Sequence, residues 1–137
     1  MIRFKTTRFG ELEVTEDKLI YFPEGLPGLR GNRRFVLIDY KDTDIKWLQS
    51  VDTPSVAFIV IDPFSIEPTY SVTLPDTMRE LIGLEKPQDV AVLVILRKEK
   101  DSIIANLQGP LVINTVNRRG VQLVLDSQEP KVYNKKS

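Results

Sequence analysis

A short segment near the amino terminus restricts the backbone more than any other part of the chain: residues 22–28 read FPEGLPG. Its two prolines fix φ at about −65° and lack a backbone N–H, so no helix or central strand can continue through them. Its glycines allow the positive φ that tight turns need. A stiff loop of this kind loses little entropy on binding, which predicts that Leu26, with Gly25 and Pro27, contacts a partner. A turn that plugs a β-core with Phe22 and Leu26 is the structural alternative.

The composition narrows the possible chemistry. The chain has 137 residues, a length typical of one domain, and it has 19 basic and 19 acidic residues. This balance lacks the basic excess of a nucleic-acid-binding protein. Because there is no cysteine and no histidine, disulfides, thiolate chemistry and the commonest general base are excluded. We expect no cofactor and no metal.

The amino terminus shows no basic segment followed by an apolar run, which a signal peptide would need. No apolar stretch approaches the roughly 20 residues that span a bilayer. These features predict a cytoplasmic protein without membrane contact.

Apolar residues alternate with polar ones, or run continuously, in about ten short segments separated by turn residues. The predicted strands are residues 2–9, 11–15, 19–22, 35–39, 46–51, 56–61, 90–96, 102–107, 111–113 and 120–125. One helix is predicted over residues 75–82, with Pro75 at its first position and Gly83 after its end. The pattern favours an all-β, mainly antiparallel fold with one short helix, as a single-domain barrel-like or sandwich structure. We expect this domain to cover residues 1–126 and residues 127–137 to form a flexible tail.

Several motifs, taken in this order, resemble the FliW family of bacterial flagellar assembly factors. The motifs are FPEGLPG at 22–28, WLQS at 47–50, Asp52 with Pro54, VIDP at 60–63 followed by Tyr70, NLQGP at 106–110, VIN at 112–114 and GVQ at 120–122. The resemblance runs from the first hairpin to about Leu125, and nothing is carried over to residues 131–137.

The resemblance implies a non-enzymatic partner switch on an antiparallel, barrel-like fold. Such a protein binds newly made flagellin near its carboxyl-terminal region. Once flagellin is exported, the free factor binds the RNA-binding regulator CsrA and relieves repression of flagellin messenger RNA. No direct contact with nucleic acid is implied.

Loops held by a β-scaffold are common recognition elements, so the partner contacts are predicted at the loop and at the strand ends. The predicted contact residues are Gly25, Leu26, Pro27, Gln49, Asp52, Asp62, Phe64 and Asn106. Trp47, Phe58 and Tyr70 are assigned to the core. Asp42 and Asp44, in an acidic segment, are expected to face basic CsrA. For the motif residues and for this segment alike, ordinary turn chemistry is the structural alternative.

A second function stays open at this point. Paired carboxylates can hydrolyse glycosides, and Asp39, Asp42, Asp44, Asp52 and Asp62 are available. The alternative to the partner switch is therefore a carboxylate-based hydrolase acting on a sugar-like substrate, which would need a cleft holding two close carboxylates.

Overall fold

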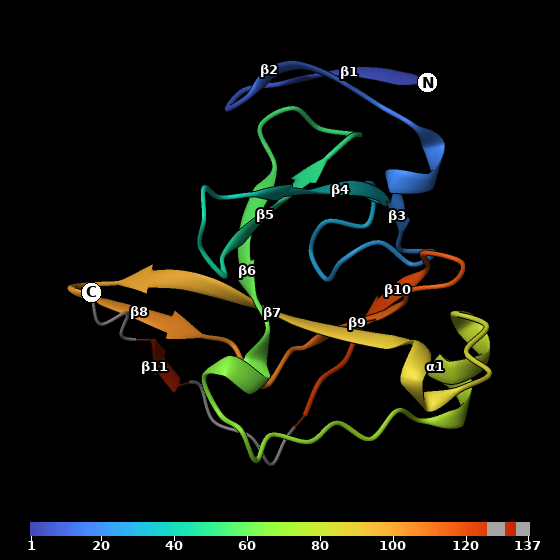
Figure 1. The fold of residues 1–137 in the computed structure, drawn as a ribbon, viewed down its shortest axis with the longest axis vertical. Coiled ribbons are helices and arrows are strands. Elements are labelled where there is room, and N and C mark those ends of the chain that lie inside the picture. Colours follow the sequence, from blue (N-terminus) through green and yellow to red (C-terminus); the bar gives the residue numbers. More distant parts are fainter. Residues whose placement is uncertain (126–130, 134–137) are drawn as a thin grey trace.

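The computed structural model describes residues 1–125 and 131–133, and within them strands are the main regular secondary structure (Figure 1). The strands are β1 (Ile2–Thr6), β2 (Gly10–Val14), β3 (Ile20–Tyr21), β4 (Arg34–Asp39), β5 (Lys46–Ser50), β6 (Ala57–Ile61), β7 (Val90–Glu99), β8 (Ser102–Ala105), β9 (Leu111–Asn114), β10 (Gly120–Gln122) and β11 (Lys131–Tyr133). The helices are α1 (Asp76–Leu81) and the 3-10 turns η1 (Glu16–Lys18), η2 (Pro63–Ser65) and η3 (Pro87–Asp89). The predicted all-β class with one short helix is confirmed.

One antiparallel sheet organises the molecule, in the strand order β10-β9-β7-β6-β5-β4-β3. The sheet curls until its two ends meet: the Tyr21 N–H at β3 donates to the Arg118 carbonyl (2.9 Å), and Tyr21 forms a parallel bridge with Arg119. The sheet is therefore open as a ladder but barrel-like in shape. β7 crosses the whole molecule and pairs with β6 on one edge, and with β9 and then β8 on the other (Figure 1).

The central strands are apolar on both faces because each face meets a different core. Inside the curl lies an inner core of Ile20, Phe22, Leu26, Phe35, Leu48, Val60, Leu111 and Ile113. On the outer face of β6 and β7, Ile61, Val94 and Leu96 pack with Tyr70 and Leu107. Burial on both faces is what the nearly continuous apolar runs at residues 56–61 and 90–96 predict.

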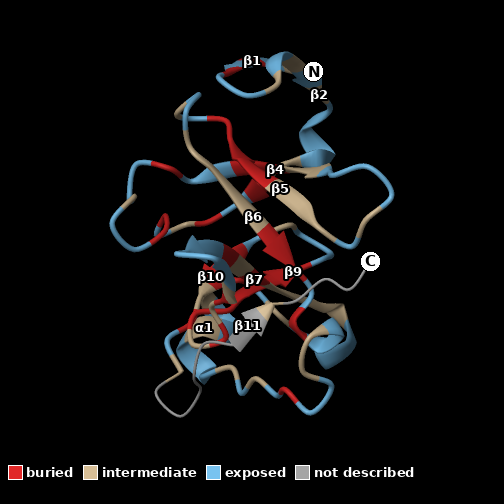
Figure 2. Cartoon of the chain, turned by 90° about the vertical axis from the view of Figure 1, so that its left-hand side faces the viewer, coloured by how far each residue is buried: buried red, intermediate tan, exposed pale blue. Residues whose placement is uncertain are grey.

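The amino-terminal hairpin β1–β2 is a separate two-stranded sheet that lies over one end of the curled sheet (Figures 1 and 2). Gly10 supplies the positive φ of its turn (+71°). Phe4 packs against Val36 and Val51, and the turn adds a hydrogen bond from the Thr7 N–H to the Pro54 carbonyl (2.9 Å) and a ring contact between Phe9 and Trp47.

The predicted helix is present but shorter than expected. Pro75 is the residue before the first helical turn, and Gly83, with φ +63°, follows the end. Six residues cannot hold a helix alone. Met78, Leu81 and the fully buried Ile82 supply the packing that does.

Part of the expected flexible tail, residues 131–133, is a strand in the structure. They form β11, which pairs antiparallel with β8 from Lys131 opposite Ala105 to Tyr133 opposite Ile103. The rest of the predicted tail, residues 127–130 and 134–137, lies outside the described residues, as does residue 126. A three-residue strand is too short to give a clear alternation in sequence, and its pairing is set by the edge of β8.

Candidate functional site

The proline–glycine loop is folded inward. Leu26 is 3% exposed and belongs to the inner core with Phe22. Gly25 is also buried, and a Cβ there would lie 2.6 Å from the Arg30 carbonyl oxygen. Leu26 therefore takes the place that the structural alternative gave it, because the chain after it folds back over it; of the three predicted loop contacts, only Pro27 is exposed.

Gln49 is also placed inside the molecule, with 0% of its surface exposed. Its side-chain Nε2 donates to the carbonyl oxygens of Ser50, Pro54 and Val56, at 2.9, 3.2 and 3.2 Å. It ties the β5–β6 connection together, so its predicted contact with a partner would need local opening. Its Oε1 has no partner among the described residues.

Asp52 anchors the start of β4. One carboxylate oxygen accepts the backbone N–H groups of Arg33 and Arg34, both at 2.9 Å, and the other accepts the Arg34 guanidinium at 2.8–2.9 Å. Burial acts to raise the pKa of Asp52, but these hydrogen bonds and the Arg34 charge outweigh it and lower the pKa below its usual value. The carboxylate is thus occupied by its own chain, through partners 18 and 19 positions away rather than through the local turn hydrogen bonds of the structural alternative.

Asn106 begins the corner that separates β8 from β9. These two strands pair with successive stretches of β7, and residues 106–110 bulge out between them. The Asn106 N–H still donates to the Ile95 carbonyl of β7 (2.9 Å), and the residue is half-buried. The NLQGP motif therefore interrupts the pairing along this side of β7 and separates it into two strands, β8 and β9.

The acidic turn between β4 and β5 lies at the surface. Asp42 and Asp44 are exposed. Lys41 takes a positive φ (+51°) there, and the Thr43 hydroxyl donates to the Tyr40 carbonyl (2.6 Å). Asp39 is paired with Lys46, whereas no ion pair between described residues involves Asp42 or Asp44. Their charges are available to a basic partner.

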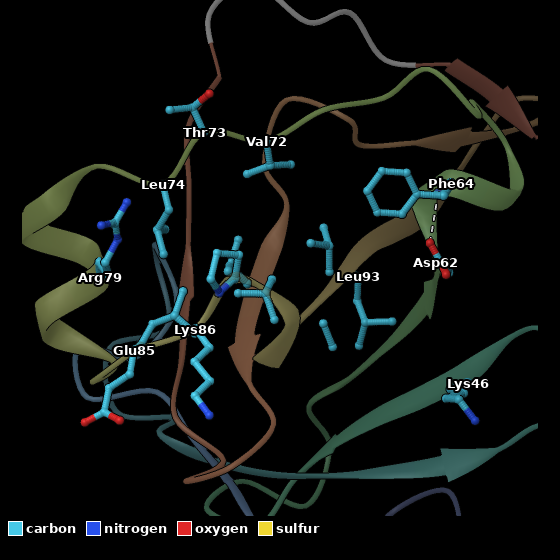
Figure 3. A pocket seen from close by; sticks show the side chains of 16 residues that line it. Lys46, Asp62, Phe64, Val72, Thr73, Leu74, Arg79, Glu85, Lys86 and Leu93 are labelled. Carbon is cyan, nitrogen blue, oxygen red and sulfur yellow. Dashed lines mark hydrogen bonds between the residues drawn. The ribbon is translucent and has the colours of Figure 1, made fainter.

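Asp62 and Phe64 lie together at the rim of a groove of about 890 Å³ (Figure 3). Asp62 accepts the Phe64 N–H through Oδ1 (2.9 Å) and starts η2, the turn that ends β6. Phe64 is 43% exposed and meets the edge of the Tyr70 ring, with centroids 5.9 Å apart. The Tyr70 hydroxyl donates to the Leu107 carbonyl (2.7 Å), and burial raises the pKa of this phenol.

The groove brings together residues that sequence motifs did not single out. Its apolar walls come from β7, from the stretch that precedes α1 and from the loop that follows it; they include Val72, Leu74, Leu84, Val92 and Leu93. Charged side chains stand around it: Lys46, Asp62, Arg79, Glu85 and Lys86. One feature of the sequence pointed to this groove: the apolar run of β6 ends at Asp62-Pro63, whereas the apolar run of β7 is longer.

Of the predicted contacts, the structure brings Asp62 and Phe64 together in the groove, and leaves Asp42 and Asp44 in a separate turn. Trp47, predicted to be in the core, is half-buried, with the Arg8 guanidinium 4.3 Å from its ring centroid. In the part of the chain that the structure describes, no group of three or more Asp or Glu side chains is placed to hold a metal ion. Within the same residues, no helix has the length and apolar character needed to cross a membrane.

Comparison with known proteins agrees with the motif resemblance and extends it. The model of the FliW protein family matches residues 3–136, past the Leu125 limit of the motifs. The flagellar assembly factor FliW of Caldicellulosiruptor bescii is 37% identical over 126 residues, covering 90% of this chain and 83% of that protein. The factor of the same name from Geobacillus thermodenitrificans is 39% identical over 132 residues, covering 95% and 92%.

A crystal structure of the flagellar assembly factor FliW superposes with a TM-score of 0.85 at 38% identity, covering 98% of this chain and 96% of that one. Fold, motifs and length thus agree over nearly the whole chain. The chain belongs to the FliW family of flagellar assembly factors.

Proposed function

We propose that this protein binds newly made flagellin through the flagellin carboxyl-terminal region and, when free of flagellin, binds and antagonises CsrA in the cytoplasm. The observation that carries the proposal is membership of a flagellar assembly family over nearly the whole chain. The antagonism of CsrA relieves repression of flagellin messenger RNA. Unexported flagellin occupies the protein and keeps it from CsrA, so flagellin limits its own synthesis until it is exported.

The molecule offers surfaces of two different kinds for two partners. The turn with Asp42 and Asp44 presents unpaired negative charge, which suits a basic RNA-binding protein. The groove beside Phe64 is lined mainly by apolar side chains, which suits a partner recognised by burial of apolar surface. Separate surfaces would make the switch depend on coupling between them, or on steric overlap of the bound proteins.

Titration calorimetry of the full chain with purified flagellin, and separately with CsrA, tests the proposal. We expect saturable binding of each partner, and displacement of CsrA when flagellin is added. No heat from either partner at tens of micromolar, where even weak interfaces register, would overturn it.

The hydrolase alternative finds no matching geometry in the groove. Its two carboxylates, Asp62 and Glu85, stand at opposite sides (Figure 3). Acid–base hydrolysis needs two carboxyl groups roughly 5–10 Å apart across one scissile bond, and Asp62 is already held in the cap of η2.

A further inference from the structure

Within the residues that the structure describes, one edge of β7 has no strand beside it at the first four positions, residues 90–93. On the β6 side, pairing runs from Leu96 opposite Ile59 to Val94 opposite Ile61, and there β6 ends. On the other side, pairing with β9 continues to Val90 opposite Asn114. Residues 90–93 of β7 are therefore paired on one edge only, and these same four residues line the groove.

The alternation of the strand shows which backbone groups face the vacant side. The carbonyls of Asp89 and Ile95 accept from Thr115 and Asn106, on the β9 and β8 side. Since successive residues of a strand point their N–H and C=O groups to opposite edges, the N–H and C=O of Val92 and the C=O of Val90 point toward the groove. Within residues 1–125 and 131–133, no hydrogen bond outside the ladders reaches these groups of Val92.

The local sequence explains why β6 does not cover this edge. Pro63 would be the residue opposite Val92 if the pairing of β6 continued, and proline has no N–H to donate. Its carbonyl is also used, because it accepts the N–H groups of Ile66 and Glu67 in η2. The Asp62-Pro63 break thus turns the chain away and leaves the edge of β7 open inside an apolar groove.

An unpaired strand edge flanked by apolar side chains suits the binding of an extended polypeptide. The edge supplies main-chain hydrogen bonds and the walls supply pockets for alternate side chains, as in β-strand addition. Phe64 on one side and Val72 and Leu74 on the other provide such walls (Figure 3). A small polar ligand would leave these apolar walls unused.

We infer that residues 90–93 of β7 take up an extended, mainly apolar segment of unassembled flagellin as an added strand. This inference rests on the proposed function, and it names the part of the surface that binds flagellin. A subunit that has not yet assembled exposes apolar segments that it will later bury, and an apolar groove suits a segment of that kind. Basic CsrA matches it less well, because the lining is mainly apolar and its charged side chains are of both signs, Lys46, Arg79 and Lys86 beside Asp62 and Glu85.

Amide hydrogen exchange at single-residue resolution tests the inference on the intact protein. In the free protein the Val92 N–H exchanges rapidly, while those of Ala91 and Leu93, which face β9, are protected. Saturation with unassembled flagellin slows Val92 by about tenfold or more, and saturation with CsrA leaves it unchanged.

The outcomes separate the two proposals. Flagellin that binds without slowing Val92 overturns the added strand and leaves the proposed function standing. Absence of flagellin binding, seen by calorimetry, overturns the function itself. Protection of Val92 that rises with protein concentration in the free state would make a second copy the occupant, and protection by CsrA would make that regulator the occupant; either result overturns the inference.

A pair of matched variants gives an independent readout. Phe64→Ala removes an exposed ring at the groove, and Val116→Ala removes an exposed side chain (73%) that lines a different hollow. We expect Phe64→Ala to weaken flagellin binding roughly tenfold, as for a modest hot spot, and Val116→Ala to leave it unchanged. Equal affinities in two variants that melt like the parent contradict the assignment of the groove.

Discussion

At the scale of single residues, the buried and capped side chains of the predicted site decide stability. Asp52 receives two backbone N–H groups and one guanidinium, so the start of β4 depends on one carboxylate. Leu26 and Gln49 fill the interior. These residues therefore hold the loop backbones in place, and other residues form the exposed surface of the loops.

The Asp52 carboxylate makes stability depend on pH in a stated direction. Its pKa is lowered on folding, so the stabilisation is complete above the unfolded value of about 3.9 and is lost as the pH falls through the folded value. We expect Asp52→Asn to cost about 1–2 kcal/mol near neutral pH, with the gap to the parent closing at acid pH. Denaturant titrations at neutral pH and at about pH 3 measure it; a gap of constant size would contradict the role of the charge.

Leu26 should behave as a core residue. Because it is 3% exposed among Phe22, Phe35 and Leu48, Leu26→Ala is expected to cost about 2–4 kcal/mol, with flagellin and CsrA binding by the folded fraction unchanged. Pro27→Ala, on the exposed side of the same loop, is the control and should shift stability by less than about 1 kcal/mol. Chemical melts followed by binding titrations decide this; a Leu26→Ala protein that melts like the parent but binds weakly would return Leu26 to the contact surface.

At the scale of elements, the sequence predicted the positions of the strands but not which neighbours cover or pair with them. Alternation and apolar runs indicate a strand from its own residues, and so the segments at 46–51 and 56–61 match β5 and β6 within a residue or so. The cover over Leu26, the pairing of β11 and the open edge of β7 depend on segments far away in sequence. Of the predicted site, the turn with Asp42 and Asp44 was readable because turn chemistry is local.

The β4–β5 turn is the element with available charge. Asp42→Asn combined with Asp44→Asn is expected to slow association with basic CsrA several-fold at low salt, with little change at high salt, because exposed charges steer encounters and are screened over roughly 8 Å at physiological ionic strength. Glu99→Gln with Asp101→Asn removes the same charge from the β7–β8 turn as a control. Stopped-flow rates at two salt concentrations measure the effect; the prediction fails if both double variants associate at the rate of the parent.

At the scale of the whole molecule, the seam between β3 and β10 brings the ends of the large sheet together. Tyr21 bridges to Arg119, and the Arg118 guanidinium donates to the carbonyls of Leu19 and Lys18, at 3.4 and 3.1 Å. Beside the seam, Gly120 has no space for a side chain, since a Cβ would lie 2.8 Å from the Phe22 ring.

Gly120→Ala therefore tests the seam. We expect it to cost about 1–3 kcal/mol, as for overpacking of a core, through displacement of Phe22. Gly31→Ala, at a glycine with nothing within 4 Å of the added Cβ, should change stability far less. Thermal melts of both variants provide the comparison, and equal midpoints would show that the ring moves aside freely.

The seam also bears on the order of events during synthesis. Arg118 is 99 positions from Leu19 and 100 positions from Lys18, whose carbonyls it contacts. Contacts between residues so far apart in sequence form late, because a long loop must close first. A ribosome that has made only β1 to β9 has produced the strands of the inner core without the segment that closes it. Until residues 118–120 emerge, Phe22 lacks the part of its cover that Gly120 provides, and the nascent chain cannot yet act as a finished binding protein.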